Sequence, residues 1–131
     1  MLAAMTHIPS LSPYAPIIGF CAAVRAGEWV HVAGTTAVDG AGEIVGGDDP
    51  AAQTREVLRK IGAALEEAGA GLQDVVRTRI YLTDADDWEA VGRVHGEVFA
   101  TVRPAASMLV LGLLDPRMRV EIEAVAYAPS A

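Results

Sequence analysis

The segment from Arg119 to Tyr127 alternates with a period of two, and this pattern constrains the fold strongly. Side chains of a β-strand point alternately to the two faces of a sheet, so we predict a strand with one apolar face. The apolar face carries Val120, Ile122, Ala124 and Ala126, and the other face carries Glu121, Glu123, Val125 and Tyr127. A chain with such a strand needs a second layer packed against the apolar side.

A helix is predicted to supply part of that layer. Asp49-Pro50 is a strong helix start, because an Asp side chain caps the free N–H groups and proline fits the first helical position. Apolar residues then recur at helical spacing until Gly69 ends the helix. On its surface, Glu56 and Lys60 stand four residues apart and are expected to form an ion pair.

A second helix is predicted after residue 85. Asp86 is expected to cap it, with Glu89 three residues later completing a capping box, and Pro104 follows its end. Strands are expected over residues 17–24, 28–33, 75–82 and 107–114, with a hairpin over 35–45 around Asp39-Gly40. Residues 1–16 contain three prolines and are predicted to form an irregular N-terminal arm.

The predicted order βββαβαββ describes one α+β domain over residues 1–131, a sheet with two helices on one face. Two helices cover only one face, yet the 107–114 segment is apolar on both sides. An uncovered apolar face of that size predicts self-association. The alternative is that the N-terminal arm folds over it.

Charge limits the partners of this chain. Lys and Arg number 10 and Asp and Glu 17, so the net charge is -7. An acidic surface repels phosphate backbones and anionic lipid headgroups, so we expect neither nucleic acid nor a membrane as partner. The single cysteine, Cys21, cannot form an internal disulfide, which suits a reducing cytoplasm.

Few residues suggest chemistry by themselves. His7, His31 and His95 lack metal-ligand spacing, so no metal site is predicted. The carboxylates of Glu121 and Glu123 share the face without helices. If association buries that face, the pKa of at least one should rise, and a carboxyl of raised pKa can activate a water. The alternative is a salt bridge across the same face, to Arg77, Arg79 or Arg119.

Several segments, taken in order, resemble the Rid (RidA/YjgF) family, formerly called "L-PSP endoribonuclease". They span about residues 17–127: Gly19 to Val24, Val30 to Thr35, Gln53-Thr54, Ala68-Gly69, Val75 to Tyr81, Phe99, Arg103 to Ala105 and Val120 to Ala124. The resemblance implies a chorismate-mutase-like fold. It also implies a homotrimer whose sheets line a central barrel, with small-molecule clefts between subunits. The activity it implies is hydrolysis of enamines and imines, such as 2-aminoacrylate, without metal or organic cofactor.

In that family an arginine grips the substrate carboxylate, and a glutamate of the last strand positions the water. The resemblance assigns the glutamate to Glu121 and keeps Gly34, but it places Ala106 where the arginine stands. Met108 takes the place whose backbone carbonyl holds the water. Other polar positions of the cleft are changed to Phe20, Ala33 and Gly92.

A cleft that keeps a carboxyl and loses its cation should bind carboxylates poorly, by on the order of 2–5 kcal/mol. We therefore expect weak activity on 2-aminoacrylate and a better fit for a neutral or cationic ligand with an apolar body. Arg103 or Arg119 could compensate by moving into the cleft. A non-catalytic small-molecule-binding or chaperone-like trimer is the alternative. A ribonuclease is disfavoured, because the chain is acidic and no histidine pair is evident.

Overall fold

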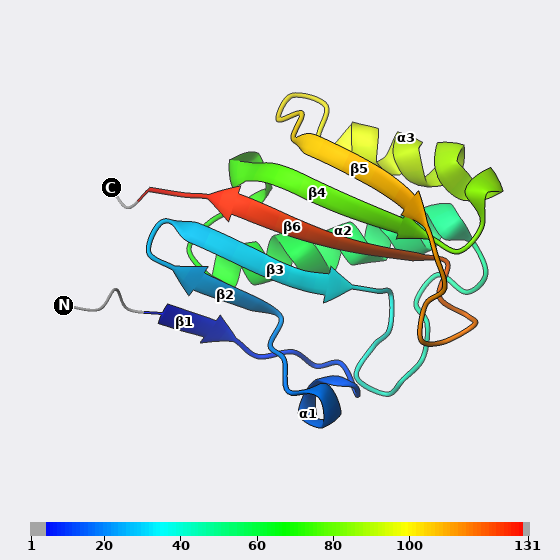
Figure 1. Ribbon diagram of the computed structural model, residues 1–131, viewed down its shortest axis with the longest axis horizontal. Helices are drawn as coiled ribbons and strands as arrows, with labels where there is room; N and C mark the ends of the chain where they lie inside the picture. The colour runs from blue at the N-terminus through cyan, green and yellow to red at the C-terminus, as the bar shows by residue number, and fades with distance from the viewer. Residues whose placement is uncertain (1–4, 130–131) are drawn as a thin grey trace.

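The computed structural model describes residues 5–129 and consists of one six-stranded sheet with two helices packed on one face (Figure 1). The strand order is β1-β2-β3-β6-β4-β5. Only β4 and β5 run parallel, and all other neighbours are antiparallel. The strands are β1 (Met5–Ile8), β2 (Ala23–Ala26), β3 (Trp29–Thr35), β4 (Val75–Leu82), β5 (Ala105–Val110) and β6 (Val120–Tyr127). The expected α+β architecture with helices on one face is confirmed.

The helices are α1 (Ala15–Ile18), α2 (Pro50–Glu67) and α3 (Trp88–Val98), with single 3-10 turns at Leu72–Asp74 and Ala85–Asp87. Helix α2 begins as predicted, because the Asp49 carboxylate accepts hydrogen bonds from the N–H groups of Ala51 and Ala52 at 3.0 and 3.3 Å. Its apolar stripe packs on the sheet. The core between helices and sheet includes Val57, Leu58, Ile61 and Leu65 of α2, Val91 and Val94 of α3, and Val120, Ile122, Ala124 and Ala126 of β6.

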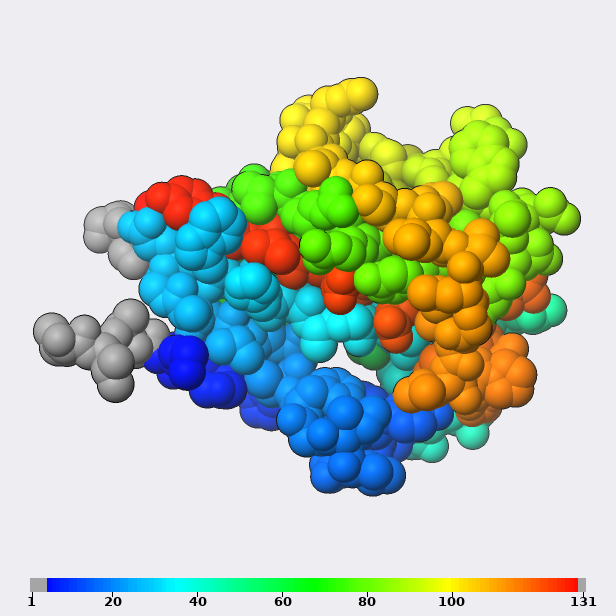
Figure 2. All heavy atoms as spheres, in the orientation of Figure 1, coloured from blue at the N-terminus to red at the C-terminus, as the bar shows by residue number. Residues whose placement is uncertain are grey.

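The last strand β6 has the alternation expected of it. Its even-numbered side chains are buried and its odd-numbered side chains are partly or fully exposed. Strand β6 lies between β3 and β4, so its odd-numbered residues occupy the middle of the face that no helix covers. Figure 2 looks onto this open face.

The N-terminal part of the chain differs from expectation. Residues 5–8, expected in an irregular arm, form an edge strand that pairs with β2, while residues 1–4 of that arm lie outside the described residues. The strand expected over 17–24 is wrong at its start, where the chain forms α1. Pro16 fits the first turn of a helix, and Gly19 ends it in the left-handed conformation at φ 86°.

The start of the second long helix also differs. Asp86 caps nothing; Asp84 caps the preceding 3-10 turn by accepting from the Asp86 N–H at 2.9 Å. Helix α3 begins at Trp88, the predicted capping box is absent, and Glu89 pairs with Arg93. The carboxylate of Asp87 is held by Arg119, the residue just before the distant β6, a contact that no local pattern reveals.

Two further boundaries shift. The hairpin over 35–45 is reduced to one bridge between Val38 and Ile44, although the Asp39 carboxylate does hold the turn. The 107–114 strand is instead β5, Ala105–Val110, at an edge of the sheet, and most of its side chains are exposed. Within residues 5–129 no helix is long and apolar enough to cross a bilayer.

Candidate functional site

The two carboxylates of β6 lie on the open face as predicted, but their surroundings differ. Glu123 accepts a hydrogen bond from the Tyr81 hydroxyl at 2.9 Å and pairs with Arg79 at 3.3 Å. The Tyr81 pKa is raised, chiefly because its hydroxyl donates to this carboxylate. The salt bridge to an arginine, the alternative given for Glu121 and Glu123, is therefore formed by Glu123.

Glu121 is different. Among residues 5–129 no side chain donates a hydrogen bond or pairs with its carboxylate, which is half-buried. Burial, and to a lesser degree the charge of Glu123, raise its pKa. A carboxyl of raised pKa without a fixed partner can hold a water and exchange a proton with it.

Gly34 leaves the space that Glu121 occupies. Gly34 lies in β3 beside β6, where the pairing shifts between Val32 and Thr35. A Cβ atom at position 34 would lie 2.9 Å from Glu121 Oε2, closer than real Cβ contacts come, and 3.0 Å from its Cδ, which is also tight. The fold thus brings the predicted site residues Gly34 and Glu121 into contact.

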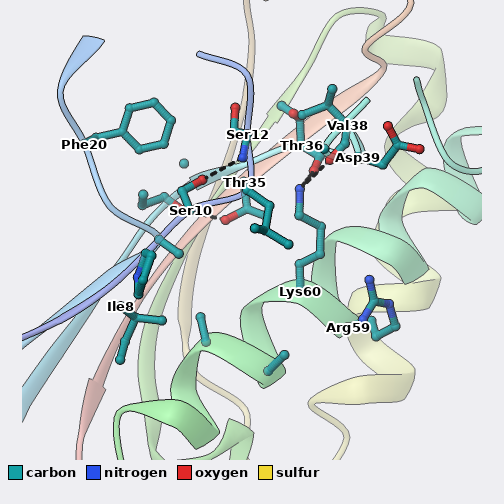
Figure 3. Close-up of a pocket in the computed structure, with 18 of the residues that line it drawn as sticks. Ile8, Ser10, Ser12, Phe20, Thr35, Thr36, Val38, Asp39, Arg59 and Lys60 are labelled. Atoms are coloured by element: carbon teal, nitrogen blue, oxygen red, sulfur yellow. Dashed lines mark hydrogen bonds between the residues drawn. The ribbon is translucent and has the colours of Figure 1, made fainter. Parts of the chain in front are cut away.

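Phe20, Ala33 and Gly34 line one pocket of about 290 Å³. The pocket lies between residues 8–12, the end of β3 and helix α2, and Phe20 projects into it from the chain after α1 (Figure 3). Figure 2 shows an opening in the same region, between α1 (blue) and the orange loop that follows β5. Three of the predicted site residues therefore share a wall, with Glu121 against Gly34.

The other three predicted residues lie elsewhere. Gly92 of α3 faces Met108 of β5, whose Cε would be 3.9 Å from a Cβ added at Gly92. Ala106 is exposed on β5 in register with Thr78, whose side chain is buried against the helices. These residues form a second group at the β5 edge.

One chain does not bring the two groups together. Glu121 is in register with Tyr81 on the open face, whereas Ala106 is in register with Thr78 on the helix face. Strand spacing and rise place their Cα atoms about 14 Å apart. A single site that uses both residues would need two copies of the chain.

Of the two arginines that could compensate, Arg119 is engaged elsewhere. Arg119 is held by Asp48 at 2.7 Å and by Asp87 at 3.2 Å, and these contacts raise its pKa. Arg103 is exposed, with the unusual φ of 51° in the turn before β5. Within residues 5–129, no three His, Cys, Asp or Glu side chains lie close enough together to form a group that could hold a metal ion.

Sequence reasoning missed two polar side chains. Lys60 was expected to pair with Glu56, but Glu56 pairs with Arg59, and the Lys60 ammonium donates to the carbonyls of Thr36 and Val38. The helical spacing contained a signal, because Lys60 lies three residues after the buried Val57. The second is His95, whose Nε2 lies 2.9 Å from the Thr78 hydroxyl and whose pKa burial lowers.

Comparison with known proteins agrees with this fold. The profile of the family described as Endoribonuclease L-PSP matches residues 11–128. The chain belongs to this family. Its fold matches the crystal structure of Rv2704 from Mycobacterium tuberculosis, a member of the YjgF/YER057c/UK114 family, with a TM-score of 0.87 and 48% identity. That match covers 95% of this chain and 100% of the other.

Two curated relatives extend the comparison. A 3-aminoacrylate deaminase, RutC, of Acinetobacter baylyi is 38% identical over 91% of this chain and 90% of its own length. An uncharacterized protein of Streptomyces coelicolor is 42% identical over 95% of this chain and 92% of its own length. The suspected membership of the Rid/YjgF family is confirmed, and a relative named as a deaminase lies within it.

Proposed function

We propose that this protein is a cytoplasmic hydrolase that converts a neutral imine or enamine to a carbonyl compound and ammonia, in clefts between the subunits of a homotrimer. The observation that carries the proposal is Glu121, a half-buried carboxyl of raised pKa placed against Gly34. The relative named 3-aminoacrylate deaminase supports the reaction class.

The proposed trimer explains why the two groups of site residues are separate. Phe20, Ala33, Gly34 and Glu121 of one subunit would face Gly92, Ala106 and Met108 of the next. The β5 edge supports this arrangement, because the free edge of an outermost strand with exposed apolar side chains is a typical interface. Those side chains are Met108, Leu109 and Val110, followed by Leu111 and Leu114.

Glu121 would act as the acid and base of the reaction. Ionised, it accepts a proton from water as the water oxygen bonds to the imine carbon. It returns that proton to the nitrogen, which gives a carbinolamine. Glu121 then takes the proton of the carbinolamine hydroxyl and passes it to the nitrogen, so that the carbonyl forms, the carbon–nitrogen bond breaks and ammonia leaves. A carboxyl with a pKa raised by burial is suited to both steps near neutral pH, because its protonated and ionised forms are then closer in free energy.

The substrate class follows from the wall opposite Glu121. Ala106 and Gly92 offer no charge there, so a substrate carboxylate would face Glu121 without a partner. A neutral imine with an apolar body avoids that cost and fits the apolar surfaces of Phe20, Ala33 and Met108.

The test compares two substrates. A neutral aliphatic imine is released in situ by an amine oxidase, and 2-aminoacrylate by a serine dehydratase, and the rate of ammonia formation is followed with and without the protein. We expect acceleration for the neutral imine, little for 2-aminoacrylate, and at least a hundredfold loss of the acceleration in Glu121→Gln. Acceleration that survives Glu121→Gln unchanged would remove Glu121 from the mechanism.

A second variant tests the lost anchor. Ala106→Arg restores a cation at the β5 edge, and we expect it to raise turnover of 2-aminoacrylate while lowering that of the neutral imine. Arg93→Gln, a change at an exposed arginine on the outer side of α3, serves as the control and should alter neither rate.

A non-catalytic binding protein is the second candidate. Its support is the apolar character of Phe20, Ala33 and Gly92, which removes hydrogen-bonding groups from the cleft. The two functions differ in one measurement, because a binding protein would retain neutral amines or imines in equilibrium dialysis without accelerating ammonia release.

A further inference from the structure

The pocket of about 290 Å³ extends well beyond the wall formed by Phe20, Ala33 and Gly34. Away from that wall it is lined by α2, from which Lys60 extends toward Thr36 and Val38, as Figure 3 shows. Its apolar lining includes Ile8, Leu11, Val38 and Ala63, with the hydroxyls of Ser10 and Ser12 at the side. This shape suits a ligand with an apolar chain and one polar end.

Lys60 provides the polar end. Its Nζ donates to Thr36 O at 2.7 Å and to Val38 O at 2.8 Å. An ammonium has three N–H donors, so one remains for a ligand. Burial lowers the Lys60 pKa, and the nearby charge of Glu56 offsets this only in part. A buried ammonium of this kind gains from a further acceptor.

The carboxylates around Lys60 are engaged with other groups. Glu56 receives two hydrogen bonds from Arg59, both at 2.7 Å. The Asp39 carboxylate accepts from the N–H groups of Ala41 and Glu43, both at 2.9 Å. The other cation that lines the pocket, Arg59, is bound to Glu56, so Lys60 is the cation placed to pair with a ligand, while Glu67 on the same wall disfavours a second negative charge.

We propose that this pocket binds a short-chain monocarboxylate, with its carboxylate at Lys60 and its alkyl chain between Leu11, Phe20 and Ala63. The volume lies just below the roughly 300–1,000 Å³ that is usual for ligand pockets, which favours a chain of a few carbons. Binding here needs only one copy of the chain. Glu121 does not line this pocket, so binding here does not require the reaction proposed for Glu121, although Phe20, Ala33 and Gly34 border both sites.

Hexanoate is the probe, and its affinity for the full-length protein is measured by isothermal titration calorimetry. Lys60→Gln removes the charge, while its amide can still donate to one of the two carbonyls, and we expect at least tenfold weaker binding. Ala63→Leu fills the pocket without touching Lys60 and should weaken binding as much. Arg55→Gln, at an exposed position of the same helix paired with Glu97, should leave the affinity unchanged.

Hexanamide has the same chain without the charge. It should bind the wild-type protein at least tenfold more weakly than hexanoate does, and the two ligands should bind Lys60→Gln with equal affinity. Unfolding in urea confirms that each variant is folded. The proposal is overturned if the wild type does not bind hexanoate at millimolar concentration. It is also overturned if Lys60→Gln or the folded Ala63→Leu variant binds hexanoate as tightly as the wild type.

Discussion

Adding one methyl group at Gly34 tests whether this glycine exists to make room for Glu121. In Gly34→Ala the new Cβ would lie 2.9 Å from Glu121 Oε2 and 3.0 Å from Cδ. The backbone at Gly34 is not in the left-handed region, so alanine is not excluded by its φ. The atoms that must move belong to the end of a flexible side chain, so the carboxylate shifts and the strand stays.

The size of the effect follows from that overlap. Restoring ordinary van der Waals contact moves the carboxylate by roughly 0.5 Å, which costs of order 0.5–1.5 kcal/mol if a torsion leaves its preferred value. A misplacement of 1 Å can lower a catalytic rate by about a hundredfold, so half that distance predicts about a tenfold loss of imine hydrolysis. Stability should therefore change little and turnover substantially.

The assay is a double-mutant cycle with Glu121→Ala, read by urea unfolding. We expect the cost of Gly34→Ala to vanish when the carboxylate is absent. A carbon-13 NMR titration gives the second readout: the methyl group displaces water from the carboxyl and should raise the Glu121 pKa further. The reasoning is refuted if Gly34→Ala is equally destabilising in both backgrounds and leaves the Glu121 titration unchanged.

Three other changes test separate parts of the structure. Burial raises the Glu121 pKa above its usual 4.5. The protonated carboxyl therefore contributes its full stability below pH 4.5, and this contribution is lost as the pH rises through the pKa of the folded protein. Because glutamine stays neutral, Glu121→Gln should unfold at a higher urea concentration than the wild type at pH 7, but not at pH 3.5. Buried Gln53 bonds the carbonyls of Gly47 and Arg117 and the N–H of Arg119, so Gln53→Leu should cost about 3 kcal/mol in urea unfolding, whereas the exposed Gln73→Leu should cost almost nothing. Leu109→Lys at the exposed β5 edge should reduce the mass measured by light scattering from about three times 13.7 kDa to that of one chain.

The sequence predicted the structure best where a local pattern permits only one geometry. The alternation over 120–127 predicted which side chains of β6 are buried, because a strand allows only two faces. Asp49-Pro50 predicted the start of α2, because capping depends on groups within one turn. In contrast, Asp86 did not cap α3. A local pattern cannot show that Arg119, more than thirty residues away, takes the carboxylate of Asp87.

The same division applies to the site. The alternation of residues determined that the Glu121 carboxyl would lie on the open face. The family resemblance determined that Ala106 would stand at the position of the arginine. Only the tertiary structure decided that Glu121 lacks a partner such as Glu123 has, and that Gly34 leaves room for the Glu121 side chain. It alone decided that the Lys60 side chain lines a pocket. It also decided that Glu121 and Ala106 lie on opposite faces of one sheet. Such facts depend on strand order and register, which arise from packing between distant segments, and a linear pattern records only the faces of each segment by itself.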